Sequence, residues 1–429
     1  MLSRGLFKGA AVEVSKAISA PSLRGQTVVL AASGGLDSCT ITRWLTDQGA
    51  SVVCCTLDLG QPDEEGFDTI KERLLKAGAA EVVILPAVDE LLSAGMQVIQ
   101  AQAWYEGRYW NTTGIARYVL VSAIVSFMKE RGYTIFSHGA TGRGNDQVRF
   151  QLAAAMLNPS ITVYAPWRDP AFLSSFRGRA EMIEFCQSQG IPITASKDKP
   201  YSTDANILGL THEAGILEFL ETAPTAISPI MGVHATEAPN SPAQISITFK
   251  KGVPVAIDGE ELPLRELFEK VNRVAGQHGV GIAAHLVENR FVGIKSRGVY
   301  EAPGMELLGS CYGLLLELIL DRRAREFFDV VSRQVAKQIY QGYWFDLATT
   351  MSLRALDPIA ELANGTIAVT MYKGAVRYSR ATGIENSLYD PEQSSMEAVG
   401  SFDHADSEGL LRVLGISARA LAIAGQVRE

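Results

Sequence analysis

Short, continuously apolar runs alternate with helical patterns over the first part of the chain, from Thr27 to about Pro170. The apolar runs are rich in β-branched residues and have the length of strands: TVVLAAS, SVVCCTLDLG, EVVILPAV and TIFSHGA. The segments between them have helical periodicity, and each ends close to a glycine: DSCTITRWLTDQG, GFDTIKERLLKAG and GIARYVLVSAIVSFMKERG. Strands that are apolar on both faces and alternate with helices predict a doubly wound parallel sheet of the α/β class.

The second half of the chain has a different pattern, typical of an α+β domain. Two segments predict β-hairpins: QISITFKKGVPVAIDG (residues 244–259) and IAVTMYKGAVRYSRAT (residues 367–382). A long helical region is predicted from Glu306 to about Tyr340, and SEGLLRVLGISARALAIAG predicts a closing helix. We therefore expect an N-terminal arm over residues 1–26, an α/β domain over 27–180, an α+β domain over 181–400 and a C-terminal helical arm over 401–429.

Composition narrows the classes of protein to consider. The 429 residues carry 39 basic and 47 acidic side chains, a net charge of −8, which argues against a nucleic-acid partner that needs a broad basic face. No apolar run approaches the roughly 20 residues that span a bilayer, so we expect no membrane partner. The five cysteines form neither a CxxC pair nor a zinc-like cluster, and Cys54-Cys55 lies in a predicted buried strand. Such thiols suit a reducing compartment and predict a cytoplasmic protein.

The first 25 residues leave one alternative to that localisation. They are basic, contain serines and are nearly free of acidic residues, loosely like an organelle transit peptide. Glu13 and the lack of an Arg-rich pattern favour an ordinary N-terminal arm.

The first predicted strand ends in SGGLDS, residues 33–38. At such a strand-to-helix turn, unpaired N–H groups and the helix dipole favour an anion, and adjacent glycines let the backbone approach phosphate oxygens. The loop is neither a Walker A motif nor a Gly-x-Gly-x-x-Gly motif. The alternative is a tight turn that needs glycine for steric reasons alone. The hydroxyls of Ser33 and Ser38 on either side of Asp37 favour a phosphate site.

A second polar loop, HGATGRGNDQVRFQ (residues 138–151), also follows a predicted strand. It contains three glycines and, within nine residues, five side chains that can bind a ligand: Thr141, Arg143, Asn145, Asp146 and Arg149. A dense polar loop at the carboxyl end of a parallel strand indicates a binding site. The alternative is a surface turn in which Asn145 or Asp146 caps a helix.

These motifs resemble a known family. SGGLDS is similar to the pyrophosphate loop of N-type ATP pyrophosphatases, which cleave ATP between the α and β phosphates. HGATGRGNDQVRFQ resembles the aspartate- and ATP-contacting loop of argininosuccinate synthases. Three further stretches agree with that family: LGQPDEE from Leu59, YSTDANILGLTHEAGILE from Tyr201 and LVENRFVGIKSRGVYEAPG from Leu286. The resemblance implies an ATP-pyrophosphatase domain over residues 27–180, a synthetase and multimerisation domain over 181–400, and a homotetramer.

The resemblance also implies three sets of site residues. ATP, a substrate, would contact Ala31, Ala32, Ser33, Gly34, Gly35, Leu36, Asp37, Ser38, Cys39, Leu57, Gly139, Thr141, Asp146 and Asp204. Aspartate would contact Thr141, Asn145 and Asp146. Citrulline would contact Tyr109, Asn145, Arg149, Ser202, Thr211, Glu213, Glu288 and Tyr300. Asp37 would help to hold Mg²⁺ through the pyrophosphate, and no tightly bound organic cofactor is expected.

The implied reaction has two halves. The ureido oxygen of citrulline attacks the α-phosphorus of ATP and pyrophosphate leaves; the amine of aspartate then displaces AMP from citrullyl-AMP, giving argininosuccinate. No side-chain nucleophile is needed, and we assign none. The alternatives are another ATP pyrophosphatase with this loop, such as a tRNA thiolation enzyme, and a non-catalytic module that senses ATP.

Several assignments stay open at this stage. Asp146 suits the ammonium of aspartate and Arg149 the carboxylate of citrulline, while either Glu213 or Glu288 suits the citrulline ammonium. Without the resemblance, both glutamates could be helix-surface charges, and Tyr109 and Tyr300 half-buried aromatics. Two further points stay open. In the loop SGGLDSC, Cys39 stands where many relatives have a hydroxyl that could donate to phosphate, and in YEGRYWNTTGIAR either Thr112 or Thr113 could contact citrulline. We assign no catalytic role to His138 or His212, and no general base.

Overall fold

The computed structural model describes residues 20–63, 66–193, 201–397, 399–400 and 403–428. Most of the predicted N-terminal arm, residues 1–19, lies outside the described residues, as do the last two residues of LGQPDEE.

The first part of the chain forms the predicted parallel sheet. Its strand order is β3-β2-β1-β4-β5, and every neighbouring pair is parallel. The strands are β1 (Thr27–Ala31), β2 (Ser51–Asp58), β3 (Glu81–Pro86), β4 (Ile135–His138) and β5 (Thr162–Tyr164). The strand order reverses between β1 and β4, and in such sheets ligands bind beyond the carboxyl ends of the strands at this reversal.

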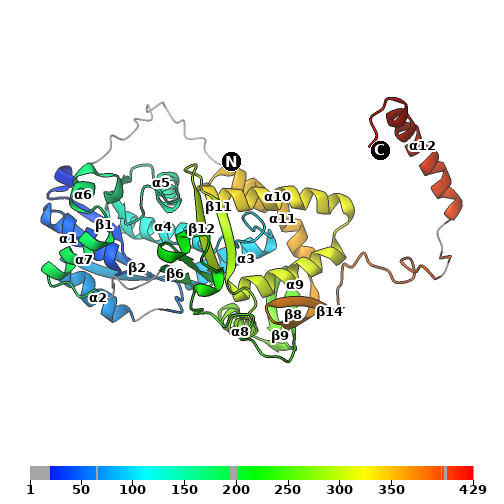
Figure 1. The fold of residues 1–429 in the computed structure, drawn as a ribbon, viewed down its shortest axis with the longest axis horizontal. Helices are drawn as coiled ribbons and strands as arrows, with labels where there is room; N and C mark the ends of the chain where they lie inside the picture. Colours follow the sequence, from blue (N-terminus) through cyan, green and yellow to red (C-terminus); the bar gives the residue numbers. More distant parts are fainter. Residues whose placement is uncertain (1–19, 64–65, 194–200, 398, 401–402, 429) are drawn as a thin grey trace, which may run out of the picture.

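Helices cover both faces of this sheet (Figure 1), because successive strand residues point to opposite sides. Val28, Leu30 and Cys54 belong to the core on one face, with α1 (Leu36–Asp47), α2 (Phe67–Lys76), α6 (Pro170–Ser175) and α7 (Arg179–Ser188). Val29 and Cys55 belong to the core on the other face, with α3 (Val88–Gln100), α4 (Thr112–Arg131) and α5 (Asp146–Leu157). The doubly wound α/β prediction is confirmed, as is the buried strand at Cys54-Cys55.

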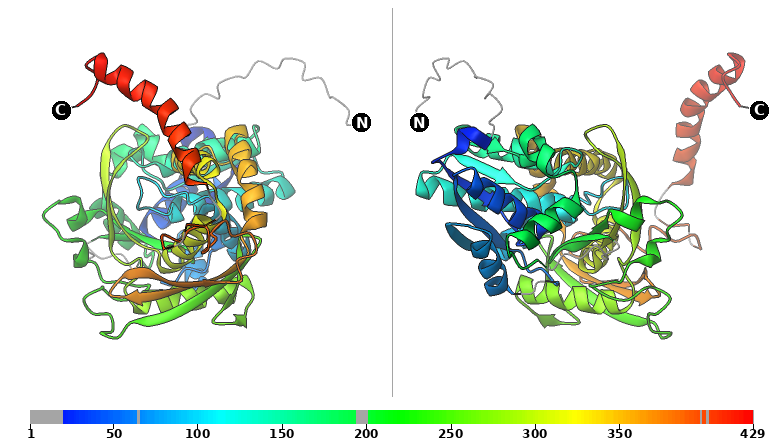
Figure 2. Two further views of the ribbon diagram at one scale, coloured as in Figure 1. Left: turned by 90° about the vertical axis from the view of Figure 1, so that its right-hand side faces the viewer. Right: turned by 60° about the vertical axis from the view of Figure 1, so that its left-hand side comes forward.

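The second part of the chain contains two antiparallel sheets. Both predicted hairpins form and join one sheet of order β10-β9-β8-β13-β14. Its strands are β8 (Ala243–Lys250), β9 (Val253–Ile257), β10 (Glu260–Glu261), β13 (Gly365–Tyr372) and β14 (Ala375–Thr382). The other sheet, of order β11-β12-β7-β6, was not predicted; its strands are β6 (Ser202–Asn206), β7 (Gly209–Glu213), β11 (Ala284–Asn289) and β12 (Lys295–Glu301). The views in Figure 2 show the antiparallel strands beside the α/β part.

The long helical region predicted from Glu306 to about Tyr340 is confirmed, and it consists of two helices. α9 (Pro303–Ile319) ends before Leu320, and α10 (Arg322–Gln341) begins after Asp321. The Asp321 carboxylate accepts a hydrogen bond from the N–H of Ala324 at 2.8 Å, which is an N-cap interaction that starts a new helix. α8 (Leu264–Gln277) and α11 (Leu347–Leu362) complete the helices around the antiparallel part.

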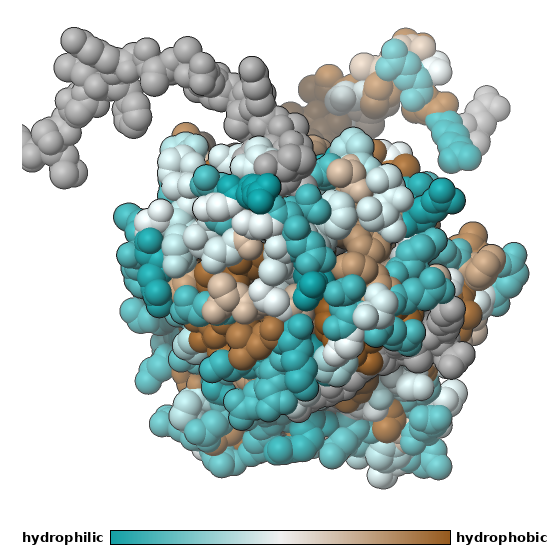
Figure 3. Space-filling view, turned by 90° about the vertical axis from the view of Figure 1, so that its left-hand side faces the viewer, coloured by the Kyte–Doolittle hydropathy of each residue, from teal (hydrophilic) through white to brown (hydrophobic). Residues whose placement is uncertain are grey.

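The closing helix is confirmed as α12 (His404–Ile423). It stands away from the body of the protein (Figures 1 and 2), and none of its residues is buried. Six apolar side chains on it are more than half exposed: Leu410, Leu411, Val413, Leu414, Ile416 and Ile423. In contrast, the face of the body turned to the viewer in Figure 3 mixes hydrophilic side chains with small apolar areas. Among the described residues, no helix is long and apolar enough to cross a membrane.

Candidate active site

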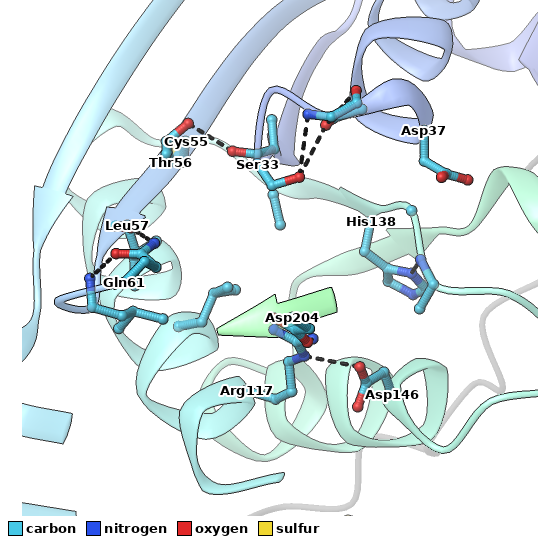
Figure 4. A pocket seen from close by; sticks show the side chains of 18 of the residues that line it. Ser33, Asp37, Cys55, Thr56, Leu57, Gln61, Arg117, His138, Asp146 and Asp204 are labelled. Atoms are coloured by element: carbon cyan, nitrogen blue, oxygen red, sulfur yellow. Dashed lines mark hydrogen bonds and ion pairs between the residues drawn. The ribbon is translucent and has the colours of Figure 1, made fainter. Parts of the chain in front are cut away.

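A cavity of about 460 Å³ opens at the carboxyl ends of β1, β2 and β4, where the strand order reverses. Figure 4 shows Ser33 and Asp37 along one side of it and Arg117, Asp146 and Asp204 along the opposite side. Most of the residues that the sequence assigned to ATP line this cavity: Ala31, Ala32, Ser33, Gly35, Asp37, Ser38, Leu57, Gly139, Asp146 and Asp204. We call this space the nucleotide cavity.

The glycine turn at the end of β1 adopts a conformation that suits glycine. Gly34 has φ of +72°, in the left-handed region, and a Cβ built there would lie 2.9 Å from Cγ2 of Ile70. Gly35 then caps α1, whose first-turn N–H groups lie at the cavity. The Ser38 hydroxyl donates to the carbonyl of Gly35 at 3.2 Å, and its oxygen lies 3.4 Å from the hydroxyl oxygen of Ser33. The turn therefore gathers amides and two hydroxyls where an anion can bind.

Asp37 is the acidic group closest in sequence to this turn. The indole N–H of Trp167 donates to its Oδ1 at 3.2 Å. Burial raises the pKa of Asp37, and the Trp167 hydrogen bond acts in the opposite direction. Among the described residues, no group of three or more His, Cys, Asp or Glu side chains could hold a metal ion. One carboxylate beside a phosphate site fits Mg²⁺ nevertheless, because Mg²⁺ commonly takes one or two carboxylates, with substrate phosphates and water as its other ligands.

The opposite wall of the nucleotide cavity contains a network of charges centred on Arg117, from α4. Its Nε donates to Asp146 at 2.9 Å, and its Nη2 pairs with Asp204. Arg149 donates to the other oxygen of Asp146 at 2.7 Å. Burial opposes ionisation of Asp146, but the charges of Arg117 and Arg149 outweigh it and hold its pKa at about 2. Burial raises the pKa of Asp204.

A second, smaller cavity of about 140 Å³ adjoins the first, and the two share Ala140, Asp146 and Asp204 in their walls. The residues that line it come from α4 and the segment before it, the loop after β4 and the start of α5, and the unpredicted sheet with the residue after β11: Tyr109, Thr113, Ala140, Thr141, Gly144, Asn145, Asp146, Arg149, Asp204, Thr211, Glu213, Glu288, Arg290 and Tyr300. We call this space the amino-acid cavity. All residues assigned to aspartate and all but one of those assigned to citrulline lie in its wall.

Glu288 is held in place by two tyrosines. The hydroxyl of Tyr300 donates to one carboxylate oxygen and that of Tyr340 to the other. The ring of Tyr300 stacks on Tyr109, with 4.3 Å between centroids, and the Tyr109 hydroxyl accepts from the N–H of Thr113 at 3.0 Å. Burial raises the pKa of Tyr300, so the phenol stays protonated and donates. Glu288 lies on a strand, and the helix-surface alternative is wrong for it.

Glu213, on β7, is the second carboxylate of the amino-acid cavity. Nη2 of Arg290 lies 3.4 Å from its Oε2. Desolvation inside the cavity raises the pKa of Glu213 to about 7. The charge of Arg290 lowers this pKa, whereas the nearby carboxylates of Asp146, Asp204 and Glu288 raise it.

The two histidines left unassigned have structural partners. His212 alternates with Thr211 and Glu213 along β7, so it faces the other side of the sheet, where its Nε2 lies 2.6 Å from Oε1 of Glu301. The ring of His138 accepts from the N–H of Ala140 at 3.2 Å. Burial, together with the charge of Arg168, lowers the pKa of His138 to about 3, so the imidazole is neutral.

Comparisons with known proteins decide the family. Residues 27–192 match a family model described as "Arginosuccinate synthase N-terminal HUP domain", and residues 201–421 match "Arginosuccinate synthase C-terminal domain". The chain belongs to the argininosuccinate synthase family.

Curated relatives agree along nearly the whole chain. It is 40% identical over 396 residues to an argininosuccinate synthase of Rhodopirellula baltica, covering 92% of this chain and 97% of the relative. It is 40% identical over 399 residues to that of a Thermotoga species, covering 90% and 95%, and 37% identical over 405 residues to that of Moorella thermoacetica, covering 94% and 97%.

Four residues assigned from the argininosuccinate synthase resemblance do not line either cavity: Gly34, Leu36, Cys39 and Ser202. Leu36 and Cys39 are buried in the core against the sheet, and the Cys39 thiol donates to the carbonyl of Gly34 at 3.4 Å. Burial raises the pKa of Cys39 to about 12. The thiol therefore points away from the nucleotide cavity, and a hydroxyl at this position would not be a cavity donor. Ser202 is exposed at the start of β6.

The structure also brings in one residue that the sequence left open, Thr113, and two that the motif resemblance missed, Arg117 and Arg73. Thr113 lines the amino-acid cavity, with its hydroxyl 2.7 Å from that of Thr211, whereas Thr112 is buried elsewhere. Arg117 and Arg73 line the nucleotide cavity. Each of these two arginines lies on the inward face of a predicted helix. A charged residue at a position where the helical pattern calls for an apolar one is the sequence feature that indicates a functional role for them.

Proposed function

We propose that this member of the argininosuccinate synthase family joins L-citrulline to L-aspartate at the expense of ATP, giving argininosuccinate, AMP and pyrophosphate through citrullyl-AMP. One observation carries the proposal beyond family membership. The nucleotide cavity, with a glycine turn suited to phosphate, adjoins the amino-acid cavity, whose cationic and carboxylate side chains suit a zwitterion. The two cavities share Asp146 and Asp204 in their walls. A reaction between ATP and an amino acid needs this adjacency.

The geometry supports an orientation for ATP. Its β and γ phosphates would lie at the glycine turn, where the start of α1 and the hydroxyls of Ser33 and Ser38 supply donors. The α-phosphorus would then face the wall shared with the amino-acid cavity. Binding both reactants in line supplies much of the acceleration through orientation and electrostatics. Asp37 would hold Mg²⁺ through the departing pyrophosphate, and the ion would supply positive charge there.

The amino-acid cavity offers both charges that a zwitterion requires. Glu288 and Glu213 are anions for the ammonium of citrulline, and Arg149 and Arg290 are cations for carboxylates. Thr141 and Asn145 lie next to Asp146 and would bind aspartate. Asp146 pairs with Arg117 and Arg149, and these two cations keep its carboxylate ionised. The ionised carboxylate would bind the ammonium of aspartate.

We also infer a homotetramer in the cytoplasm. The exposed apolar residues of α12 support an assembly, because such a helix is stable only when another surface covers it. The five cysteines are free and buried, as expected in a reducing compartment.

A substrate panel tests the proposed reaction. Purified protein with ATP and Mg²⁺ should release pyrophosphate only when citrulline is present, and should release AMP and form argininosuccinate only when aspartate is added as well. Tight ATP binding without release would favour the sensing module, and release that depends on a tRNA would favour a thiolation enzyme. Either result would contradict the proposal.

A further inference from the structure

The buried face of α2 contains a charged residue where the helical pattern calls for an apolar one. Ile70 and Leu74 are 3% and 0% exposed, and Arg73, which lies between them on the same face, is 8% exposed. Burying a guanidinium costs free energy unless hydrogen bonds or opposite charges compensate it. An arginine in this position therefore indicates a specific contact inside the protein.

One such contact is with the backbone of the glycine turn. Nη1 of Arg73 donates to the carbonyl oxygen of Gly34 at 2.9 Å, and the Cys39 thiol donates to the same oxygen. Ile70, one turn away, packs so closely on Gly34 that no Cβ fits there. α2 thus holds Gly34 at two points, its carbonyl and its Cα.

Holding this carbonyl also sets the direction of the next N–H. In a trans peptide the C=O of Gly34 and the N–H of Gly35 point in opposite directions. With the carbonyl bound by Arg73, the Gly35 N–H points away from α2, toward the Ser33 hydroxyl, whose Oγ accepts from it at 3.4 Å. Ser33, Gly35 and Arg73 all line the nucleotide cavity. The charge of Arg73 therefore also raises the potential felt by an anion there.

We propose that Arg73 is the positioning residue of the pyrophosphate site. It fixes the peptide between Gly34 and Gly35, so that its N–H is presented to the β and γ phosphates, and it adds positive charge at that end of ATP. The inference rests on the proposed function, because it takes ATP to lie with its pyrophosphate at the turn. In this arrangement Arg73 strengthens the binding of the pyrophosphate part of ATP and has little effect on the binding of the AMP part.

Binding of three probes tests this inference: AMP, inorganic pyrophosphate and the non-cleavable α,β-methylene-ATP. Calorimetry with Mg²⁺ would compare the wild type with Arg73→Met, Arg73→Lys and the control Lys71→Met, which removes an exposed charge from the same helix. We expect Arg73→Met to weaken pyrophosphate and α,β-methylene-ATP binding about tenfold or more, with AMP binding changed less than about twofold. Arg73→Lys should recover part of the loss, because it keeps the charge without the planar fork. Lys71→Met should match the wild type.

Equal losses for AMP and pyrophosphate in Arg73→Met would show a general structural role and overturn the proposal, and so would unchanged binding of all three probes. If thermal unfolding shows that Arg73→Met does not fold, Arg73→Lys decides by the same comparison: a loss confined to pyrophosphate and α,β-methylene-ATP supports the proposal, and unchanged pyrophosphate binding overturns it. A wild-type protein that binds none of the probes would contradict the proposed function itself.

Discussion

Glu213, in the wall of the amino-acid cavity, has a pKa close to neutrality. Its ordinary value is 4.5, and desolvation together with three neighbouring carboxylates raises it to about 7. The side chain is therefore largely neutral below that pH and anionic above it. Arg290 is the cation that faces it, at 3.4 Å, and limits the shift.

This pKa gives citrulline binding a pH dependence. If Glu213 binds the citrulline ammonium, the KM for citrulline should fall as the pH rises through about 7, since the carboxylate forms in that range. Steady-state kinetics at saturating ATP and aspartate would measure the profile. Glu213→Gln should abolish the break near neutrality, whereas Glu218→Gln, an exposed control a few residues away, should keep it. A wild-type profile without a break would argue that another group meets the ammonium.

Single site residues were predictable mainly through motif resemblance. Glu288 and Tyr300 are 12 positions apart, and nothing local shows that one binds the other; their contact follows from the pairing of β11 with β12. Cys39 illustrates the reverse case. Its place in the motif suggested a phosphate contact, but Cys39 is the fourth residue of α1, and the helical rotation directs its side chain into the core.

At the scale of elements, the glycine turn depends on two properties of Gly34, its left-handed φ and its lack of a side chain. A matched control separates them, because Gly25 has the same φ of +72° with nothing within 4 Å of a built Cβ. Gly25→Ala should therefore cost only the conformational term, about 1 kcal/mol in the free energy of unfolding.

Gly34→Ala should cost more than that, because its Cβ also meets Ile70 at 2.9 Å, and it should weaken ATP binding by shifting the turn. Denaturant unfolding and ATP calorimetry on both variants would measure the two effects. Equal stability losses and unchanged ATP binding in Gly34→Ala would contradict this account of the turn.

The elements themselves were predictable where the pattern is local. The central strands and both hairpins follow from runs of apolar residues with turn residues between them. The sheet β11-β12-β7-β6 was missed because β7 pairs with β12 across more than 80 residues, and no local pattern reports such a pairing. The break between α9 and α10 was missed because the Asp321 cap lies in a continuous helical pattern.

At the scale of the whole molecule, α12 predicts how the protein assembles. If its apolar side chains pack on other copies, removing residues 401–429 should reduce the mass in light scattering below that of four chains. Leu414→Glu should act in the same direction, because it places a charge in the covered surface, whereas Arg412→Gln on the same helix should leave the mass unchanged. An intact chain that is monomeric at micromolar concentration would refute the homotetramer.

In the proposed orientation, the bond between the α and β phosphates of ATP lies at the wall between the two cavities, and isotope transfer tests that placement most directly. Citrulline labelled with oxygen-18 in its ureido group would be supplied with ATP and aspartate, and the nucleotide product analysed by mass spectrometry. Attack of the ureido oxygen on the α-phosphorus predicts that the label is recovered in the phosphate of AMP, with unlabelled pyrophosphate. Unlabelled AMP, or ADP with orthophosphate as the products, would contradict the account.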